Sequence, residues 1–254
     1  MSFTSDGSAA GFIGVRPDAL RYGETSVEPN ESVDPTEAVG ILRSFIPAGA
    51  RVLDVGCGAG GVTRAMTNGR TDQVVCVEPD QARAAAARDR GLEVHCGVFN
   101  AAFVSSHGPF DAIVFGDVLE HMADPAEALA LALDRLTPSG AVLISVPNVA
   151  HWTIRLKLLF GRFDYAETGL MDATHLRWFT RKTLIGMLER QGFAITDMTV
   201  SAGRWLHAYR RLPWRLLSTP VRNRFINALV RSFPTLFGCQ HVVRAVVRRR
   251  TISE

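Results

Sequence analysis

Residues 51–61 read RVLDVGCGAGG, a short apolar run followed by a loop in which four of six residues are glycine. Glycine lets the backbone turn tightly and approach a ligand closely. The residues that follow, 61–67, are expected to form a helix, whose first N–H groups would face a ligand lying on the loop. The stretch therefore predicts a strand, a ligand-binding loop and a helix, in that order.

The same alternation continues on both sides of this stretch. We expect strands at residues 51–55, 73–77, 92–96, 110–115, 141–146, 193–200 and 239–247, and helices at 34–45, 61–67, 81–90, 126–136 and 183–191. Asp80 and Asp124 are expected to cap the helices at 81–90 and 126–136. Strands that alternate with helices of about ten residues indicate right-handed crossovers and a parallel sheet covered on both faces. The sequence thus predicts a doubly wound α/β fold with a mostly parallel seven-stranded sheet. The last strand follows another strand through an insertion, so we expect it to be antiparallel.

The organisation of the chain is predicted from composition. Residues 1–33 are rich in Gly, Ser, Glu, Asn and Pro and show no sustained periodicity, which predicts a flexible N-terminal arm. Residues 34–254 are expected to form one domain. Two helical insertions are expected in it: a lid at about 148–182 and a basic segment at about 203–235.

Two carboxylates accompany the glycine loop and indicate its ligand. Glu78 ends the second expected strand, where a carboxylate can accept both ribose hydroxyls of a nucleoside. The glycines also satisfy the G-x-G-x-x-G pattern, so a nicotinamide-dependent oxidoreductase is the alternative interpretation. Asp54 favours another ligand, because its charge would repel a pyrophosphate and attract the sulfonium and ammonium groups of S-adenosylmethionine. A second alternative is that Asp54 caps the loop backbone.

Longer segments carry a family resemblance. RVLDVGCGAGG (51–61), VVCVEPD (74–80) and FDAIVFGDVLEHMADP (110–125) resemble signature segments of class I S-adenosylmethionine-dependent methyltransferases, and LTPSGAVLISVPNVAHW (136–152) is similar to their fifth-strand segment. The resemblance covers about residues 40–200. It implies that the cofactor is S-adenosylmethionine. The residues that it places on the cofactor are Asp54, Gly56, Gly58 and Gly60 for the methionine part, Glu78 and Pro79 for the ribose, Val98 and Phe99 for the adenine, and Asp117.

One position departs from the family pattern. The family usually has an acidic residue after the glycine of the third segment, where this chain has Val98 after Gly97. The adenine amino group would then be met by backbone atoms or by Asn100.

The acceptor site is expected beyond the carboxyl ends of the fourth and fifth strands, where ligands of open α/β sheets bind. Methyl transfer to a hydroxyl needs a base, most often histidine. His121 is the first candidate, with Glu120 to orient it; the alternative is a structural or cofactor-shielding role. His151 and His175 are the next candidates. Asp172 and His175 could share a metal ion, but this spacing is weak, and no metal site is predicted.

The insertion also points to a class of acceptor. Residues 161–180, GRFDYAETGLMDATHLRWFT, combine polar and aromatic side chains, which suits a sugar or another polar ring. The segment resembles a lid of methyltransferases associated with surface-polysaccharide assembly, and partly resembles quinone-precursor O-methyltransferases. This resemblance implies O-methylation of a glycan or another small-molecule hydroxyl. The alternative is that these residues brace the insertion on the sheet.

Charge and cysteine usage bear on partners and location. Residues 203–250 contain eleven arginines and no Asp, Glu or Lys. The amphipathic basic segment suits an anionic membrane, a lipid-linked glycan, a subunit contact or a cover over the acceptor pocket, and otherwise forms a solvated face. No nucleic-acid partner is predicted, and the oligomeric state stays open. Four scattered cysteines and the lack of a secretory signal predict a cytoplasmic enzyme. A non-catalytic nucleoside-binding regulator is a third interpretation.

Overall fold

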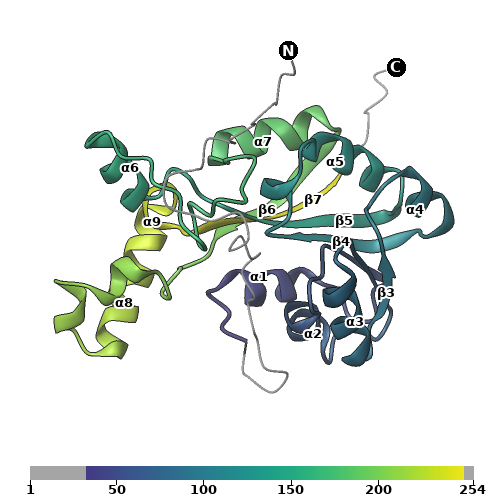
Figure 1. Cartoon of the computed structure of the whole chain (residues 1–254), viewed down its shortest axis with the longest axis horizontal. Coiled ribbons are helices and arrows are strands. Elements are labelled where there is room, and N and C mark those ends of the chain that lie inside the picture. Colours follow the sequence, from purple (N-terminus) through teal and green to yellow (C-terminus); the bar gives the residue numbers. More distant parts are fainter. Residues whose placement is uncertain (1–32, 249–254) are drawn as a thin grey trace, which may run out of the picture.

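One seven-stranded sheet organises the molecule. The computed structural model describes residues 33–248 and orders the strands β3-β2-β1-β4-β5-β7-β6 (Figure 1). The strands are β1 Val52–Val55, β2 Val74–Glu78, β3 Glu93–Cys96, β4 Phe110–Gly116, β5 Leu136–Pro147, β6 Phe193–Val200 and β7 Gln240–Val247. Neighbours from β3 to β5 are parallel, whereas β7 is antiparallel to both β5 and β6. The predicted fold class is confirmed, including the antiparallel last strand, which lies inside the sheet between β5 and β6.

Helices cover both faces of this sheet (Figure 1). One face carries α1 Ala38–Phe45, α2 Gly61–Thr67 and α3 Gln81–Asp89, and the other carries α4 Ala101–Ser106, α5 Pro125–Leu133 and α7 Arg181–Arg190. Residues of β4 alternate between the two hydrophobic cores, and Ile113, Val114 and Phe115 are all fully buried. A parallel strand covered on both sides needs such a continuous apolar run. Among residues 33–248, no helix is long and apolar enough to cross a membrane.

Local side-chain contacts set where the helices begin. Asp80 accepts a hydrogen bond from Arg83 N at 2.9 Å, and Asp124 accepts from Ala126 N and Glu127 N, so both act as the predicted N-caps. The first helix was expected from residue 34 but begins at Ala38. The reason is that Asp34 Oδ1 accepts hydrogen bonds from Thr36 N and Oγ1, which fold the preceding residues into a turn.

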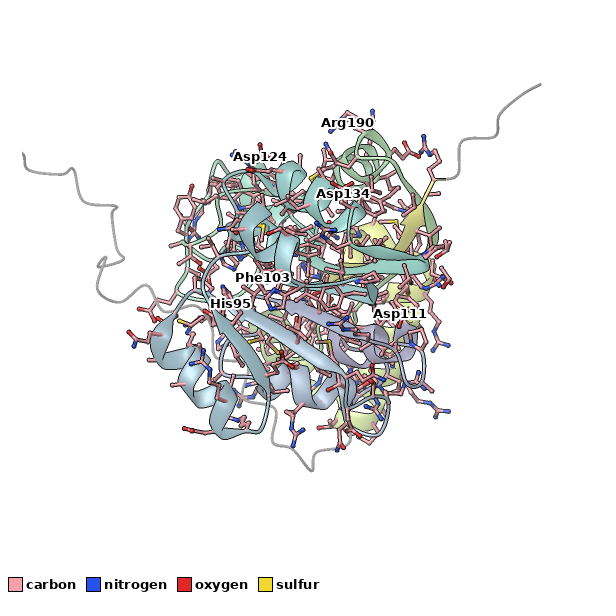
Figure 2. The ribbon with its side chains drawn as sticks, turned by 90° about the vertical axis from the view of Figure 1, so that its right-hand side faces the viewer. His95, Phe103, Asp111, Asp124, Asp134 and Arg190 are labelled. Atoms are coloured by element: carbon pink, nitrogen blue, oxygen red, sulfur yellow. The ribbon has the colours of Figure 1, made fainter. Side chains whose placement is uncertain are left out.

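The edge strand β3 is covered by an aromatic cluster. His95 of β3 lies 5.1 Å from Phe103 of α4 between ring centroids, and Phe103 stacks on His107 at 4.2 Å (Figure 2). Phe103 belongs to the hydrophobic core, so α4 anchors this cluster to the sheet. The short helix α4 was not expected from the sequence.

Two insertions leave the sheet at one edge. β5 and β6 run parallel because each is antiparallel to β7, so the segments after them start at the edge that also carries the glycine loop after β1. The first insertion contains α6 Trp152–Leu159. The second contains the 3₁₀ turns η3 His207–Arg210 and η4 Trp214–Leu216, then α8 Thr219–Ser232 and α9 Pro234–Phe237. Figure 1 shows α6, α8 and α9 together at one end of the molecule.

The second insertion is held at its two ends and through its own core. Cys239 N donates to Ser201 O at 2.9 Å, which joins the chain entering the insertion to the chain leaving it. Inside, Tyr209 is fully buried, and its hydroxyl accepts a hydrogen bond from Trp152 Nε1 at 3.2 Å. This contact ties the second insertion to α6. The predicted N-terminal arm, apart from residue 33, lies outside the described residues.

Candidate active site

The glycine loop after β1 has the backbone conformation that its sequence predicts. Gly56, Gly58 and Gly60 have φ values of 74°, 56° and 82°, in the left-handed region that side chains disfavour. A Cβ on Gly56 would lie 2.7 Å from Val118, and one on Gly60 would lie 2.6 Å from Leu92. A Cβ on Gly58 would meet nothing within 4 Å. Gly56 and Gly60 are therefore required by packing, whereas Gly58 leaves open space beside the backbone.

Glu78 fastens this loop to the end of β2. Its side chain is 5% exposed and accepts hydrogen bonds from Gly58 N at 2.8 Å and from Asp80 N at 3.0 Å. Glu78 thus holds the glycine loop beside the end of β2, and Pro79 follows it on the surface.

Asp54 belongs to β1, and its side chain contacts α2. It is 4% exposed, and its Oδ2 accepts a hydrogen bond of 2.6 Å from Thr63 Oγ1. Burial raises the pKa of the Asp54 carboxyl group to about 7, and the nearby Glu78 charge adds to the rise. The bond to Thr63 differs from the predicted alternative, in which Asp54 caps the loop backbone. A buried carboxyl group of this kind would be stabilised in its ionised form by an adjacent cation.

The segment after β3 exposes an apolar side chain. Val98 is 57% exposed, whereas Phe99 packs edge-on against Phe103 and Phe115 at 6.0 and 5.9 Å between ring centroids. Asn100 Oδ1 accepts a hydrogen bond from Phe103 N at 3.0 Å and so caps α4. The sequence suggested Asn100 or backbone atoms as partners for an adenine. Because Asn100 caps α4, backbone atoms are the better candidates for contacting an adenine.

Asp117 follows β4 in an unusual conformation. Its φ of 54° is the one positive value among the described residues other than glycine. Its carboxylate accepts hydrogen bonds from Gln240 Nε2 at 2.6 Å and Ser145 Oγ at 3.1 Å. Burial raises the pKa of Asp117, while these two bonds oppose the rise. Strained residues of this kind cluster at functional sites, and sequence reasoning missed both of the side chains that hold it.

Glu120, His121 and His175 meet beyond the carboxyl end of β4. One potential ligand atom from each residue lies within 4.8 Å of the other two, and the two imidazole centroids are 4.8 Å apart. Glu120 is 1% exposed, and neither of its carboxylate oxygens has a hydrogen-bond partner among the described residues. Glu120 therefore makes no side-chain hydrogen bond to His121, and its role in orienting that ring stays a prediction. Burial raises the pKa of Glu120 well above its usual range and lowers the pKa of His175 to about 4.

The first insertion covers the cluster of Glu120, His121 and His175. His121 Nδ1 lies 3.2 Å from the carbonyl oxygen of Thr174 and 3.1 Å from its hydroxyl. Asp172 Oδ1 accepts hydrogen bonds from Thr174 N and Oγ1 at 2.8 and 2.6 Å. The carbonyl of Glu120 accepts from the backbone N–H of Leu176 at 2.7 Å. The lid segment is therefore fastened directly to the residues that it covers.

His151 occupies a different environment. It is fully buried at the start of α6, with Nδ1 2.8 Å from Thr153 Oγ1 and Nε2 3.4 Å from the Tyr209 hydroxyl. Burial lowers its pKa to about 4. Because both ring nitrogens are engaged, the structure favours a capping role for His151 over the predicted role as an alternative base.

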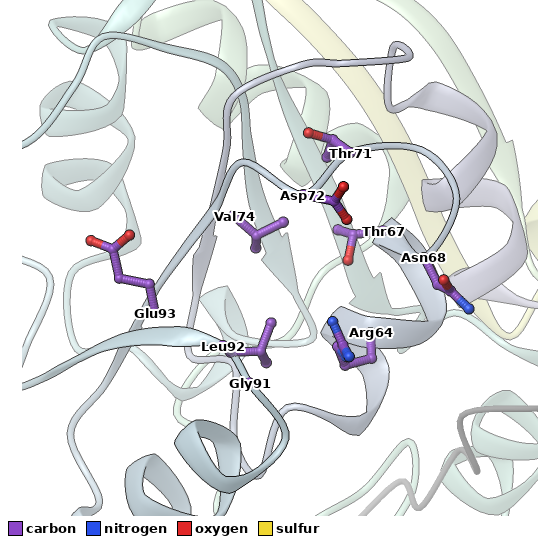
Figure 3. A pocket seen from close by; sticks show the side chains of 9 residues that line it. All are labelled: Arg64, Thr67, Asn68, Thr71, Asp72, Val74, Gly91, Leu92 and Glu93. Carbon is purple, nitrogen blue, oxygen red and sulfur yellow. The ribbon is translucent and has the colours of Figure 1, made fainter.

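Two surface cavities lie away from this edge. One, of about 280 Å³, is lined by Val74 and Glu93 at the beginning of β2 and β3 and by Arg64 of α2 (Figure 3). The other, of about 330 Å³, lies near the beginning of β4 and is lined by Asp111 and Ala112. Both are at the amino ends of the strands, opposite the glycine loop, so neither belongs to the candidate site.

Comparison with known proteins agrees with this geometry. Residues 36–197 match the family described as "Methyltransferase domain". A ubiquinone biosynthesis O-methyltransferase from Stutzerimonas stutzeri is 29% identical over 69% of this chain and 78% of its own length. A tRNA 5-carboxymethoxyuridine methyltransferase from Escherichia coli is 31% identical over 59% of each chain.

Solved structures share the fold. An S-adenosylmethionine-dependent methyltransferase from Archaeoglobus fulgidus has a TM-score of 0.55 and 21% identity, covering 83% of this chain and 92% of that one. A magnesium protoporphyrin IX methyltransferase from Synechocystis with bound S-adenosylhomocysteine has a TM-score of 0.52 and 14% identity, covering 82% and 78%. The alternative of a nicotinamide-dependent oxidoreductase gains no support from these comparisons. The chain belongs to the methyltransferase-domain family and is an S-adenosylmethionine-dependent methyltransferase.

Proposed function

We propose that this enzyme transfers the methyl group of S-adenosylmethionine to a hydroxyl group of a small molecule, a phenol or a sugar. The observation that carries this proposal is the meeting of Glu120, His121 and His175 beneath the first insertion. These groups lie past the end of β4, at the sheet edge that carries the glycine loop. The relative named as a ubiquinone biosynthesis O-methyltransferase supports an oxygen acceptor.

The cofactor is proposed to lie over the glycine loop. The open space beside Gly58 allows a ligand to approach the backbone. Asp54 would stabilise the cationic methionine end, and Glu78 would accept the ribose hydroxyls beside Pro79. The exposed Val98 and the adjoining Phe99 would border the adenine, and Asp117 would complete the site between cofactor and acceptor. When bound, S-adenosylmethionine supplies an electrophilic methyl group on a sulfonium.

The protein's part in the reaction is alignment and proton removal. The acceptor oxygen would lie near His121, whose Nδ1 faces a carbonyl oxygen and therefore carries the proton in the neutral ring. In this tautomer Nε2 is the ring nitrogen that can accept a proton. We expect His121→Ala to lower turnover by about 10²–10⁴, the usual cost of losing a general base, and to leave cofactor affinity unchanged. A loss of less than fivefold would remove His121 from this role.

The identity of the acceptor is proposed more narrowly from the second insertion. Between Arg210 and Phe233 it exposes apolar side chains among arginines, which suits an acceptor presented at an anionic membrane, such as a lipid-linked glycan. The relative named as a tRNA methyltransferase keeps RNA among the acceptors to be tested. The expected absence of a nucleic-acid partner therefore stays a prediction.

Two measurements test the proposed function. Calorimetric titration should show micromolar binding of S-adenosylmethionine and S-adenosylhomocysteine and no comparable binding of NADH. A panel of phenols, sugar nucleotides, lipid-linked glycans and RNA is then incubated with isotopically labelled methyl donor and read by mass spectrometry. Methyl ethers of a phenol or sugar are expected. A label found on nitrogen, on carbon or only on RNA would overturn the proposed acceptor class.

A further inference from the structure

The Glu120 carboxylate is the most conspicuous unsatisfied group in residues 33–248. It is almost completely buried, and neither oxygen accepts a hydrogen bond from another residue of this range, so that only the backbone of Glu120 itself interacts with the carboxylate. His175 Nδ1 is also buried without a hydrogen-bond partner, while the Leu170 backbone bonds to the same ring. Buried polar atoms are normally paired, because desolvation without a partner costs about 1–3 kcal/mol for each group. Three orphaned acceptor atoms at one place indicate a missing binding partner.

The three side chains are arranged as ligands for one ion. Their potential ligand atoms all lie within 4.8 Å of one another. Zinc bonds to imidazole nitrogen and carboxylate oxygen are about 2.0–2.2 Å long, so two ligands of one ion can be at most about 4.4 Å apart. A contraction of a few tenths of an ångström would bring all three atoms to bonding distance. Two imidazoles and one carboxylate are also a usual ligand set for sites that keep a position open.

The surroundings fit metal-ligating histidines. The second nitrogen of such a ring commonly donates to a carbonyl oxygen, which fixes the tautomer and the ring orientation. His121 Nδ1 has this contact with Thr174 O, and Thr174 is held in turn by Asp172. His121 Nε2 and His175 Nδ1 would then be the ligating atoms. The sequence offered Asp172 and His175 as a weak pair of metal ligands. In the structure Asp172 instead holds Thr174, whose carbonyl oxygen contacts His121.

We propose that Glu120, His121 and His175 bind one divalent cation of the zinc class, and that the acceptor hydroxyl occupies an open position on this ion. The role of the ion rests on the proposed O-methylation, whereas its binding can be measured independently. A bound cation lowers the pKa of a coordinated hydroxyl. When the ion is bound, His121 is one of its ligands and no longer the base, so the proton passes to water, the acceptor oxygen forms a bond to the methyl carbon, and the carbon–sulfur bond breaks. The products are a methyl ether, S-adenosylhomocysteine and one proton.

Metal binding is tested on the full chain after treatment with a chelator. Co²⁺ is titrated while its visible absorption is recorded, and Zn²⁺ is measured by competition and by elemental analysis. We expect one ion per chain for the wild type. Glu120→Gln and His175→Asn should each weaken binding at least tenfold. The exposed histidine variant His207→Ala is the matched control and should bind like the wild type.

Folding is checked by titration with S-adenosylhomocysteine. Glu120→Gln keeps the shape of a side chain that makes no hydrogen bond, so this variant should fold and bind the cofactor product normally. No saturable binding by the wild type, or unchanged binding by folded Glu120→Gln, would overturn the metal site. Full methyl transfer by metal-free enzyme would overturn it and leave the proposed function standing. Stoichiometric binding that both variants weaken supports the site, even if no hydroxyl acceptor is found.

Discussion

The Asp54 carboxyl group connects cofactor binding to pH. Its pKa of about 7 results from burial, so it is mostly protonated below neutrality and ionised above. A cationic ligand binds the ionised form better. We therefore expect S-adenosylmethionine to bind more tightly as pH rises from 6 to 8, with at most a tenfold change per unit below the pKa.

The matched variant for this prediction is Asp54→Asn, which keeps an oxygen for the bond from Thr63 Oγ1. Its affinity should be lower by about 1.5–3 kcal/mol, the range for hydrogen bonds to charged groups, and should not depend on pH. Calorimetric titrations at pH 6, 7 and 8 measure both effects. A wild-type affinity that is flat with pH would show that Asp54 does not sense the ligand's charge.

Gly58 and Gly60 differ in what an added methyl group would meet. Alanine at either position adopts a left-handed conformation, which costs about 1–2 kcal/mol. At Gly60 the new Cβ would also lie 2.6 Å from Leu92 and 3.2 Å from the backbone of Ala87. We expect Gly60→Ala to lower the free energy of unfolding by more than Gly58→Ala. Gly58→Ala should mainly weaken cofactor binding, because its methyl group occupies the open space. Urea unfolding and calorimetry separate the two outcomes, and equal stability losses would contradict this assignment.

At the scale of elements, α6 depends on its first turn. His151 caps this helix and reaches the Tyr209 hydroxyl in the second insertion. A lost cap and a lost buried hydrogen bond each cost about 1 kcal/mol, so His151→Ala should lower the free energy of unfolding by about 2 kcal/mol. Binding of S-adenosylhomocysteine should persist. If the variant keeps its stability but loses turnover, His151 would again be a candidate for the catalytic base.

Sequence alone predicted those elements whose signals are local. The caps Asp80 and Asp124 and the strands β4 and β6 follow from short patterns that burial does not override. Helix α4 was missed because it is short, and its cap Asn100, like the cap His151 of α6, resembled a ligand-binding residue. Chemistry-bearing side chains are ambiguous in this way, since the same groups bind ligands and backbone N–H groups.

The candidate site shows a second limit. Asp54, the glycine loop and Glu78 lie within 24 residues of one another along the chain, and their roles follow from strand ends. His175 reaches Glu120 and His121 only because the insertion folds back over β4, with Leu176 N bonded to the Glu120 carbonyl. No periodicity or spacing specifies that return, so the three-residue cluster could not be predicted.

At the scale of the whole molecule, the second insertion presents a basic and apolar surface. Five large apolar residues of 210–233 are more than half exposed, namely Leu212, Leu216, Val221, Phe225 and Phe233. Among them stand exposed arginines, and residues 203–248 contain no acidic side chain. Each arginine near an anionic bilayer contributes about 1 kcal/mol, screened over a Debye length of about 8–10 Å. We expect co-sedimentation with phosphatidylglycerol vesicles at low salt, decreasing as salt rises.

Charge-matched variants distinguish this surface from general basicity. Replacing Arg210, Arg211 and Arg215 with glutamine should abolish co-sedimentation without changing cofactor affinity. Replacing Arg181, Lys182 and Arg190 of α7 with glutamine removes the same amount of charge and should preserve co-sedimentation. The membrane proposal would be overturned if the wild type stays in the supernatant at low salt. It would also be overturned if the protein elutes in size-exclusion chromatography as a dimer whose interface is this surface.

The bonded ends of the second insertion have a consequence for how such enzymes diversify. Cys239 N donates to Ser201 O, and Ser201 N donates to Gln240 O at 3.0 Å, so the chain returns to the sheet beside the point where it left. Because the two ends of this segment are adjacent, the segment can be exchanged as one piece. With a short turn in its place, β6 and β7 would still form a hairpin. Grafting 203–237 between homologues should therefore move acceptor preference as a unit, while the half of the sheet that is proposed to hold the methyl donor stays unchanged.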